Sequence, residues 1–321
     1  MGESGVFVGI DVARERLDVA IRPSGEAWYV TNDLAGVQEL VQRLQGLGPT
    51  LIVLEATGGL EYLVVGELAL VGLPLAVMNP RLIRRFAQAT GRLAKTDKLD
   101  AQVLAHFAEV VRPEPRPLPD VATRELAALV TRRRQLIEMR SAELQRLRTA
   151  APRVRPQIQE HVATLTRYLA SLDHELRDRI EGSPLWRDKD DLLLSAKGVG
   201  PVLSATLLSQ LPELGRLDHR KLAALVGVAP LNQDSGQWRG KRRCWGGRGE
   251  VRAVLAMATR AAIRSNPAIR GFYQRLIAAG KVDKVALTAC MHKFLCILNA
   301  MVRHGVPWQR TYLAIDNKHS C

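Results

Sequence analysis

The sequence lacks the features of an exported or membrane-embedded protein. No uninterrupted apolar run approaches the ~18–20 residues that cross a bilayer. The first residues, Met-Gly-Glu-Ser-Gly, contain neither the basic region nor the apolar region of a signal peptide. We therefore expect a cytoplasmic protein with no membrane partner.

Cysteine is also scarce, with four residues at positions 244, 290, 296 and 321 and no C-x-x-C pair. Such isolated cysteines are typical of reduced thiols in a cytosolic protein. Cys290, His292 and Cys296 fit no common zinc-ligand spacing, and they fall in a segment with the pattern of an apolar helix. We expect no zinc site there.

Acidic residues are in deficit. Lys and Arg outnumber Asp and Glu by 46 to 32, which gives a formal charge of +14 and a pI near 10.1. An excess of this size indicates a polyanionic partner, and nucleic acid is the commonest one for a soluble chain. The 321 residues are 47% hydrophobic, which favours two or three globular domains and excludes wholesale disorder.

The first third of the chain predicts an α/β domain. Three short β-rich stretches joined by turns indicate an antiparallel meander, and Asn32 or Asp33 is expected to cap the helix that follows. The continuous apolar run 50–54 is typical of a parallel strand covered on both faces. The expected order is β-β-β-α-β-α-β-α, with strands at 6–12, 17–21, 27–30, 50–54 and 73–78 and a basic helix from Pro80.

Acids stand at selected ends of these elements. Asp11 lies near the end of the first strand and Glu55 at the end of the fourth, and a mixed sheet of this order makes those strands neighbours. Asp97 and Asp100 begin the last helix, three residues apart and on one face, with Thr96 as the expected N-cap. Taken singly, each is an ordinary strand-end or helix-start acid. Together, the four predict an oxygen-only site for Mg²⁺ or Mn²⁺, two ions of which suit phosphodiester chemistry.

The rest of the chain divides at a proline-rich stretch. We expect a first domain at 1–112, a stiff linker at 113–120, a helical hairpin or coiled coil at 121–182, and a mainly α-helical domain at 183–321. The long charged helices predicted for 121–149 and 155–182 are suited either to dimerising the protein or to lying along nucleic acid. The sequence does not separate these two roles.

Two features of the last domain point to phosphate. The pattern helix, Gly198-Val-Gly200, helix is that of a helix-hairpin-helix element, whose backbone N–H groups approach a DNA phosphate; a plain tight turn is the alternative. Downstream, Ser235 precedes a run rich in glycine and tryptophan, which suits the sugar–phosphate backbone. Its basic residues are Arg239, Lys241, Arg242, Arg243 and Arg248. On spacing alone, Ser235 is an ordinary turn residue.

Several motifs resemble one known family. G-I-D-V-A with D-V-A-I after it, L-E-A-T-G and T-D-K-L-D-A are similar to the RuvC-like, RNase H-fold domain of DEDD transposases of the insertion-sequence 110/1111 group. G-V-G-P, V-A-P-x-x-x-x-S-G, R-G-K-R-R and G-G-R-x-x-V-R resemble the second domain of that family. The likeness covers nearly the whole chain.

The resemblance implies the roles of five residues. Asp11, Glu55, Asp97 and Asp100 would form the Mg²⁺-binding DEDD cluster, and Ser235 would attack DNA to give a covalent phosphoserine. It also implies a site shared between subunits of a dimer or tetramer, and a structured guide RNA that pairs with donor and target DNA. Two rivals stay open: a RuvC-like junction-resolving nuclease that uses water, and a non-catalytic nucleic-acid-binding protein.

Overall fold

The computed structural model describes residues 5–92, 97–115, 120–232, 234–235, 238–240 and 242–308; for residues 97, 98, 238 and 239 only the backbone is described. The chain forms two compact units, Met1–Leu118 and Pro119–Cys321, and the division falls inside the proline-rich stretch.

The first unit is a five-stranded mixed sheet with helices on both faces. Strand order is β3-β2-β1-β4-β5, with β1–β2 and β2–β3 antiparallel and β1–β4 and β4–β5 parallel. This confirms the expected α/β architecture and makes the first and fourth strands neighbours. The elements are β1 Phe7–Val12, β2 Arg16–Arg22, β3 Ala27–Thr31, α1 Leu34–Leu47, β4 Leu51–Glu55, α2 Tyr62–Leu70, β5 Leu75–Met78, α3 Pro80–Ala89 and α4 Asp97–Val111.

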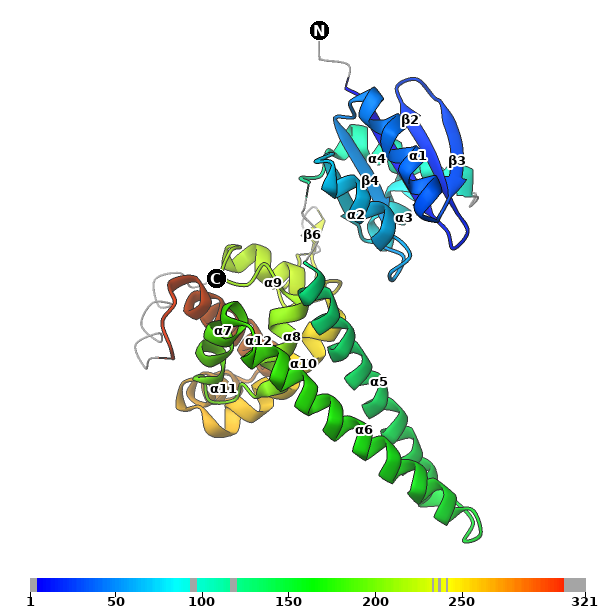
Figure 1. Cartoon of the computed structure of the whole chain (residues 1–321). Helices are drawn as coiled ribbons and strands as arrows, with labels where there is room; N and C mark the ends of the chain where they lie inside the picture. Colours follow the sequence, from blue (N-terminus) through cyan, green and yellow to red (C-terminus); the bar gives the residue numbers. More distant parts are fainter. Residues whose placement is uncertain are drawn as a thin grey trace. The chain divides into compact units, whose positions relative to one another are not determined.

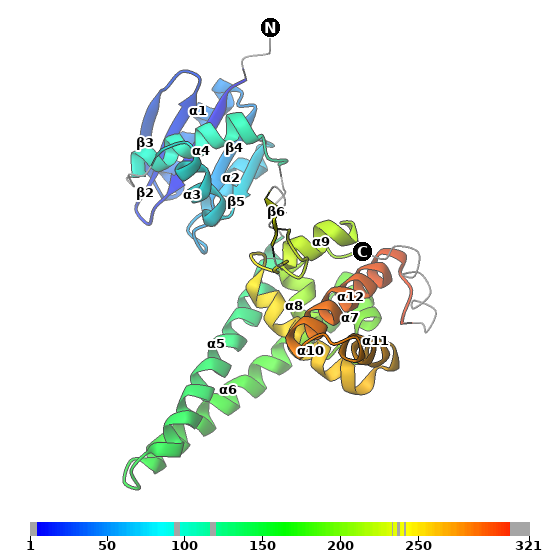
Figure 2. The ribbon, with the colours of Figure 1, turned by 180° about the vertical axis from the view of Figure 1, so that it is seen from behind.

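Alternation along the strands divides the apolar side chains between two layers. Val8, Ile10 and Leu54 pack beneath α1 and α2 on one face (Figure 1). Phe7 and Val53 pack beneath α3 and α4 on the other (Figure 2). Local signals set the helix starts: the Asp33 side chain accepts from the Gly36 N–H to cap α1, and Asn79 with Pro80 begins α3. Thr96, the expected cap of α4, lies outside the described residues.

Small residues let α4 lie close against the sheet. A Cβ built on Gly9 would come within 2.2 Å of both the Ala101 carbonyl oxygen and the Ala105 backbone nitrogen of α4. Ala101 and Ala105 also form a buried cluster with Ala20 of β2. The glycine in G-I-D-V-A therefore fixes where α4 crosses the strand that carries Asp11.

Gly9→Ala is expected to lower the free energy of unfolding of this unit by about 2–3 kcal/mol, because backbone atoms of a helix cannot move aside as a flexible side chain would. Gly66→Ala, in α2, is the control. A Cβ there meets no atom within 4 Å, so its stability should change by less than about 1 kcal/mol. Urea denaturation measures both, and equal midpoints for the two variants would contradict this packing.

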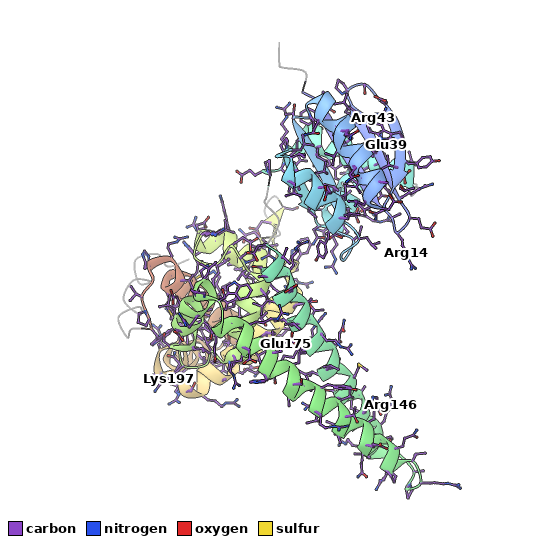
Figure 3. All side chains as sticks on the ribbon, viewed as in Figure 1. Arg14, Glu39, Arg43, Arg146, Glu175 and Lys197 are labelled. Carbon is purple, nitrogen blue, oxygen red and sulfur yellow. The ribbon has the colours of Figure 1, made fainter. Side chains whose placement is uncertain are left out.

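In the residues of the second unit that the structure describes, the regular structure is helical apart from one short hairpin. Two long helices, α5 and α6, lie side by side in opposite directions (Figure 1), joined by Leu136, Leu165 and Leu169 and by an Arg133–Asp173 ion pair. Both carry charged side chains along their length (Figure 3). The elements are α5 Val121–Thr149, α6 Arg155–Glu181, α7 Pro184–Leu194, α8 Pro201–Gln210, α9 His219–Val226, β6 Asp234–Ser235, β7 Trp238–Arg239, α10 Gly249–Ser265, α11 Pro267–Ala278 and α12 Asp283–His304.

Helix α12 passes through the core of the second unit. Within the part of the chain that the structure describes, it is the one helix long and apolar enough to cross a membrane by length and composition. Its Cys290, Phe294 and Leu298 are fully buried against the helices around it. This is the environment of a core helix, and packing inside the unit accounts for its apolar composition.

Candidate functional site

Asp11 and Glu55 lie on neighbouring strands and on the same face of the sheet. β1 and β4 pair in parallel from Phe7 with Leu51 to Ile10 with Leu54, so Asp11 and Glu55 occupy the next register position. Gly9 faces α4, and alternation turns Asp11 to that same side. The structure thus places these two acids as the strand order predicts, beneath the helix that carries Asp97 and Asp100.

A cavity of about 450 Å³ opens beside these acids. Glu55 from β4 and Asp100 from α4 both line it, which brings together two of the four predicted acids. The α3 side of its wall is strongly basic. The cavity is lined by Glu55, Pro80, Arg81, Ile83, Arg84, Arg85, Ala87, Gln88, Arg92, Asp100 and Val103.

The donor set suits a hard cation. Carboxylate oxygens are the ligands that Mg²⁺ and Mn²⁺ prefer, and Asp97 stands three positions before Asp100 at the start of α4. The side chain of Asp97 is not described. Among the side chains that are described, no group of three or more His, Cys, Asp or Glu residues is close enough to hold a metal ion. The fit of these acids to a divalent cation therefore rests on two observations. One is the register of β1 and β4, and the other is the cavity wall that Glu55 and Asp100 share.

Asp18 is a further carboxylate that sequence reasoning missed. It stands directly opposite Asp11 in the β1–β2 ladder and is buried, with only 8% of its surface exposed. Its Oδ2 accepts a hydrogen bond from Arg16 Nε at 2.8 Å. The sequence did contain a signal, because Asp18 is an acid between two apolar residues, Leu17 and Val19, of a predicted strand. The alternation of side chains along that strand puts Asp18 on the face of the sheet that bears Asp11.

The loop that carries Glu55 away from the sheet is organised by a second buried acid, Glu61. One oxygen of its carboxylate accepts hydrogen bonds from the Thr57 hydroxyl at 2.7 Å, the Gly59 N–H at 2.8 Å and the Thr57 N–H at 3.2 Å. Burial alone would raise the pKa of Glu61. Hydrogen bonds from its own backbone N–H, from Thr57 and from Gly59 outweigh burial and hold the pKa below the ordinary value of 4.5.

Glu61→Gln is expected to lower the free energy of unfolding by about 1–3 kcal/mol at pH 7, because hydrogen bonds to a charged acceptor are the stronger ones. The pKa of the folded carboxyl is lowered, so its stabilisation is present above pH 4.5 and is lost as the pH falls through the folded pKa. Urea unfolding between pH 7 and pH 3 should show wild type and variant converging in acid. A constant difference across that range would overturn this assignment.

Ser235 lies at the end of a short strand rather than in a plain turn. β6 pairs with β7 in antiparallel register, Asp234 opposite Arg239 and Ser235 opposite Trp238. A bridge between Leu231 and Arg243 closes the base of this hairpin. Ser235 is exposed. The sequence did not predict the hairpin, because strands of two residues are too short to show alternation.

Two glycines allow close contact between the two ends of the segment that bears the hairpin, which runs from α9 to α10. A Cβ on Gly247 would come within 2.4 Å of the Gly227 backbone nitrogen, so the two backbones touch where the segment leaves α9 and returns to α10. Arg252 fastens the contact by donating to the Val226 carbonyl at 3.1 Å and to the Gly246 carbonyl. The motif G-G-R-x-x-V-R therefore holds the serine-bearing hairpin in place.

Arg248 has a structural role that departs from the phosphate contact expected of it. Its guanidinium forms two hydrogen bonds of 2.6 Å with the Glu213 carboxylate and one of 2.8 Å with the Gln210 carbonyl. A side chain held in this way anchors α10 to the end of α8. The structure therefore gives Arg248 a structural role, and its contact with a phosphate stays a prediction.

Gly198 is likewise explained by packing. Its φ of +106° is in the glycine-favoured region, and a Cβ there would come within 2.4 Å of the Ala262 Cβ on α10. The side chain of Asn266 also donates to the Lys197 carbonyl at 3.2 Å, which fixes the same loop. Gly200 differs: it caps α8, and a Cβ there would meet no atom within 4 Å. Packing thus explains why glycine is required at 198, and the contact of Gly198 and Gly200 with a phosphate stays a prediction.

The remaining basic residues follow the hairpin. Arg242 and Arg243 are exposed, and Trp245 beside them is 45% exposed. The backbone of Arg239 lies in β7, whereas Lys241 lies outside the described residues. Arg242, Arg243 and Trp245 are thus exposed basic and aromatic residues at the base of the hairpin that bears the serine.

Two cysteines of the second unit, Cys290 and Cys296, lie on α12. Burial raises the pKa of Cys290 to about 11, so this thiol stays protonated at neutral pH. Cys296 Sγ lies 3.9 Å from His292 Nε2, one turn away on α12.

Comparisons with known proteins match both units. Residues 8–156 match a family model described as a transposase, of the DEDD type of IS110, and residues 190–274 match the model described as the transposase IS116/IS110/IS902 family. A pilin gene-inverting protein of Moraxella bovis is 26% identical over 325 residues, which cover 96% of this chain and 98% of that protein. An uncharacterized 42 kDa protein of insertion element IS900 from Mycobacterium paratuberculosis is 32% identical over 155 residues, 45% of this chain and 38% of that protein.

Proposed function

Because the chain belongs to the IS110 family of DNA transposases, we propose that it moves an insertion sequence by cutting and rejoining DNA with an acid cluster and a serine nucleophile. The observation that carries the proposal is the position of Asp11 and Glu55, adjacent on one face, next to a cavity that Glu55 shares with Asp100. The name of the Moraxella relative, a gene-inverting protein, favours rejoining of DNA over simple cutting.

The acids of the first unit would hold the metal. Asp11, Glu55, Asp97 and Asp100 supply oxygen donors for Mg²⁺ or Mn²⁺, which would polarise the scissile phosphate and stabilise charge on its oxygens. The sheet order, with an antiparallel meander followed by parallel strands and helices on both faces, supports an RNase H-like, RuvC-like domain. The chain itself positions the acids through the β1–β4 register and through the close approach of α4 at Gly9.

Ser235 would provide the nucleophile. Its Oγ attacks the phosphorus, an Oγ–P bond forms, and the bond from phosphorus to one deoxyribose oxygen breaks. The serine proton passes to solvent, and the leaving oxygen takes up a proton in turn. One phosphodiester replaces another, so rejoining needs no outside energy source. Arg239, Lys241, Arg242 and Arg243 would bind the phosphates and stabilise charge in the transition state.

Further partners follow from the family likeness and from the charge. We propose that the chain binds donor and target DNA, that a structured RNA guides it, and that a dimer or tetramer in the cytoplasm acts on chromosomal DNA. The α5–α6 hairpin offers a long charged surface for one of these contacts (Figure 3). The excess of 46 basic over 32 acidic residues supports a polyanionic partner of large extent.

A cleavage assay tests the proposed function. The full chain is incubated with labelled DNA that carries the element ends, with the RNA transcribed from the element, and with Mg²⁺ or with a chelator. Metal-dependent strand cleavage and joined products are expected. Cut but unjoined products would favour a RuvC-like nuclease, and intact DNA with Mg²⁺ present would leave a non-catalytic binding protein.

Binding to DNA should depend steeply on salt, because the basic surface releases counterions as it meets phosphates. Charge reversal at Arg242 and Arg243 is expected to weaken binding to all sequences alike, with a lower slope of log affinity against log salt. Fluorescence anisotropy at several salt concentrations measures the slope. An unchanged slope in the double variant would remove these two arginines from the interface.

A further inference from the structure

The serine-bearing segment, residues 227–248, connects α9 to α10, and polar contacts hold its last residues to three other helices. The Arg248 N–H donates to the Leu225 carbonyl of α9 at 2.9 Å, and its guanidinium donates to the end of α8. Glu250, in the first turn of α10, adds a contact with α5. Figure 2 shows α5, α8 and α10 beside one another. The segment that bears Ser235 therefore returns to the helical body at a point where α5, α8 and α9 meet.

Glu250 joins two of these helices through its two carboxylate oxygens. Oε1 lies 2.7 Å from Arg134 Nη2, in the middle of α5. Oε2 accepts a hydrogen bond from Gln210 Nε2 at 3.1 Å. The Gln210 carbonyl in turn accepts from Arg248 Nη1 at 2.8 Å, so the last residue of α8 contacts both residues. A continuous chain of polar contacts thus runs from α5 through Glu250 and Gln210 to the end of the serine-bearing segment.

These contacts are suited to fixing a position rather than to adding stability. The side chains of Arg134 and Glu250 are 44% and 43% exposed, and ion pairs of that exposure contribute little to the free energy of unfolding. Hydrogen bonds to a carboxylate are nevertheless directional, and each Glu250 oxygen has its own donor. A misplacement of about 1 Å can cost a reaction about 10²-fold in rate. A small contribution to folding is therefore compatible with a large one to catalysis.

We propose that Glu250 is a positioning residue for Ser235, which sets the end of the serine-bearing segment against α5 and α8. In this role it touches neither DNA nor the reacting atoms, and it acts through Gln210 and the first turn of α10. The inference rests on the proposed function, because it takes Ser235 as the nucleophile. It adds that the placement of this nucleophile depends on α5, a helix of the long hairpin that offers a surface to a partner.

The test compares two glutamate-to-glutamine variants of the full chain. Glu250→Gln keeps the size of the side chain but turns one acceptor oxygen into an N–H donor, so one of its two donors loses its acceptor. Glu143→Gln is the control, because Glu143 on α5 also contacts two side chains, Arg146 of the same helix and His161 of α6. Both variants lose one negative charge, and only the first lies next to the serine-bearing segment.

Two properties of each variant are measured. The rate at which the covalent protein–DNA species forms is measured at saturating DNA with the RNA and Mg²⁺ present, and DNA affinity and the urea midpoint are measured beside it. Amide hydrogen exchange reports on the segment itself. The Leu231 and Arg243 amides bond to each other's carbonyls across the base of the hairpin, and the Arg248 amide bonds to α9. Looser placement of the segment would speed exchange at all three.

Glu250→Gln should form the covalent species about tenfold more slowly at saturating DNA. Its affinity for DNA should not fall, its urea midpoint should equal that of the control, and its three reporter amides should exchange faster than in wild type. Glu143→Gln should match wild type in rate and exchange. The charge-exchanged variant Arg134→Glu/Glu250→Arg should recover most of the lost rate, because it restores the contact between α5 and α10.

Three results would overturn the positioning role. They are a loss of rate no larger than that of the control, a loss that lies entirely in DNA affinity, and a urea midpoint well below that of the control. The last of these would assign Glu250 to the folding of the second unit instead. Unchanged amide exchange in Glu250→Gln would equally remove Glu250 as a support of the segment.

The outcome is separable from the fate of the proposed function. If Ser235→Ala cuts DNA as wild type does, the serine function fails, and amide exchange still decides whether Glu250 holds the segment. If wild type forms the covalent species and Glu250→Gln forms it at the same rate, the function stands and the positioning role alone is wrong.

Discussion

Asp11→Asn is expected to abolish strand cleavage, with a loss of at least about 10³-fold, while binding of DNA or RNA survives. Removing one ligand charge from a shared metal site takes away several kcal/mol of transition-state stabilisation. Glu55→Gln, Asp97→Asn and Asp100→Asn should behave alike. The basic surfaces that give affinity are untouched by these changes, so nucleic-acid binding provides the internal check on folding.

Glu39→Gln is the matched control for the acid variants. Glu39 lies exposed on α1 (Figure 3) and does not line the cavity. Its neutralisation removes the same charge without touching a proposed ligand. Cleavage by this variant should equal that of wild type. Near-normal cleavage with Mg²⁺ by any two of the four acid variants would contradict the four-acid site.

Ser235→Ala has the second large expected effect, a complete stop of strand exchange with no covalent protein–DNA species formed. The exposed hydroxyl contributes at most ~0.5–1 kcal/mol to folding, so the variant should stay folded and bind nucleic acid. Ser235→Cys should keep no more than a trace of attack, because a thiolate is a poor substitute in a site built for oxygen. Ser265→Ala, at an exposed serine at the end of α10, is the control with full activity.

If the protein were a nuclease that uses water as its nucleophile, Ser235→Ala would still cut DNA. Cutting by Ser235→Ala at the wild-type rate, with all products free of protein, would leave the acid cluster as the sole active centre. Joined products from that variant would exclude the serine from rejoining as well. Gel electrophoresis of reactions containing wild type, Ser235→Ala and Ser265→Ala decides between the two.

Local patterns in the sequence were sufficient for the sheet and for two of the acids. The apolar run 50–54 and the meander before it dictate a parallel pairing of β1 with β4, and that pairing alone makes Asp11 and Glu55 neighbours. The placement of α4 depends on the close approach of Ala101 to Gly9. In the sequence these are two small residues far apart, and nothing there shows that they touch. Asp18 was missed because its position opposite Asp11 is a matter of register between strands.

Roles set by distant contacts were beyond sequence reasoning. Arg248 is one of several arginines in a basic run, and only the fold brings Glu213 to it. Gly198 matches a phosphate-binding pattern, but its lack of a side chain serves packing against Ala262. In both cases a local motif has two physical explanations, and the contact that supplies the structural one comes from a residue far along the chain.

Covalent joining of Ser235 to DNA is tested most directly by denaturing electrophoresis of wild-type protein incubated with end-labelled DNA, the guide RNA and Mg²⁺. We expect a slow-migrating labelled species that resists detergent, disappears on protease treatment, yields a DNA-linked peptide containing Ser235, and is absent from Ser235→Ala and Asp11→Asn. Cut DNA that migrates free of protein, with no such species from wild type at any time point, would contradict the account.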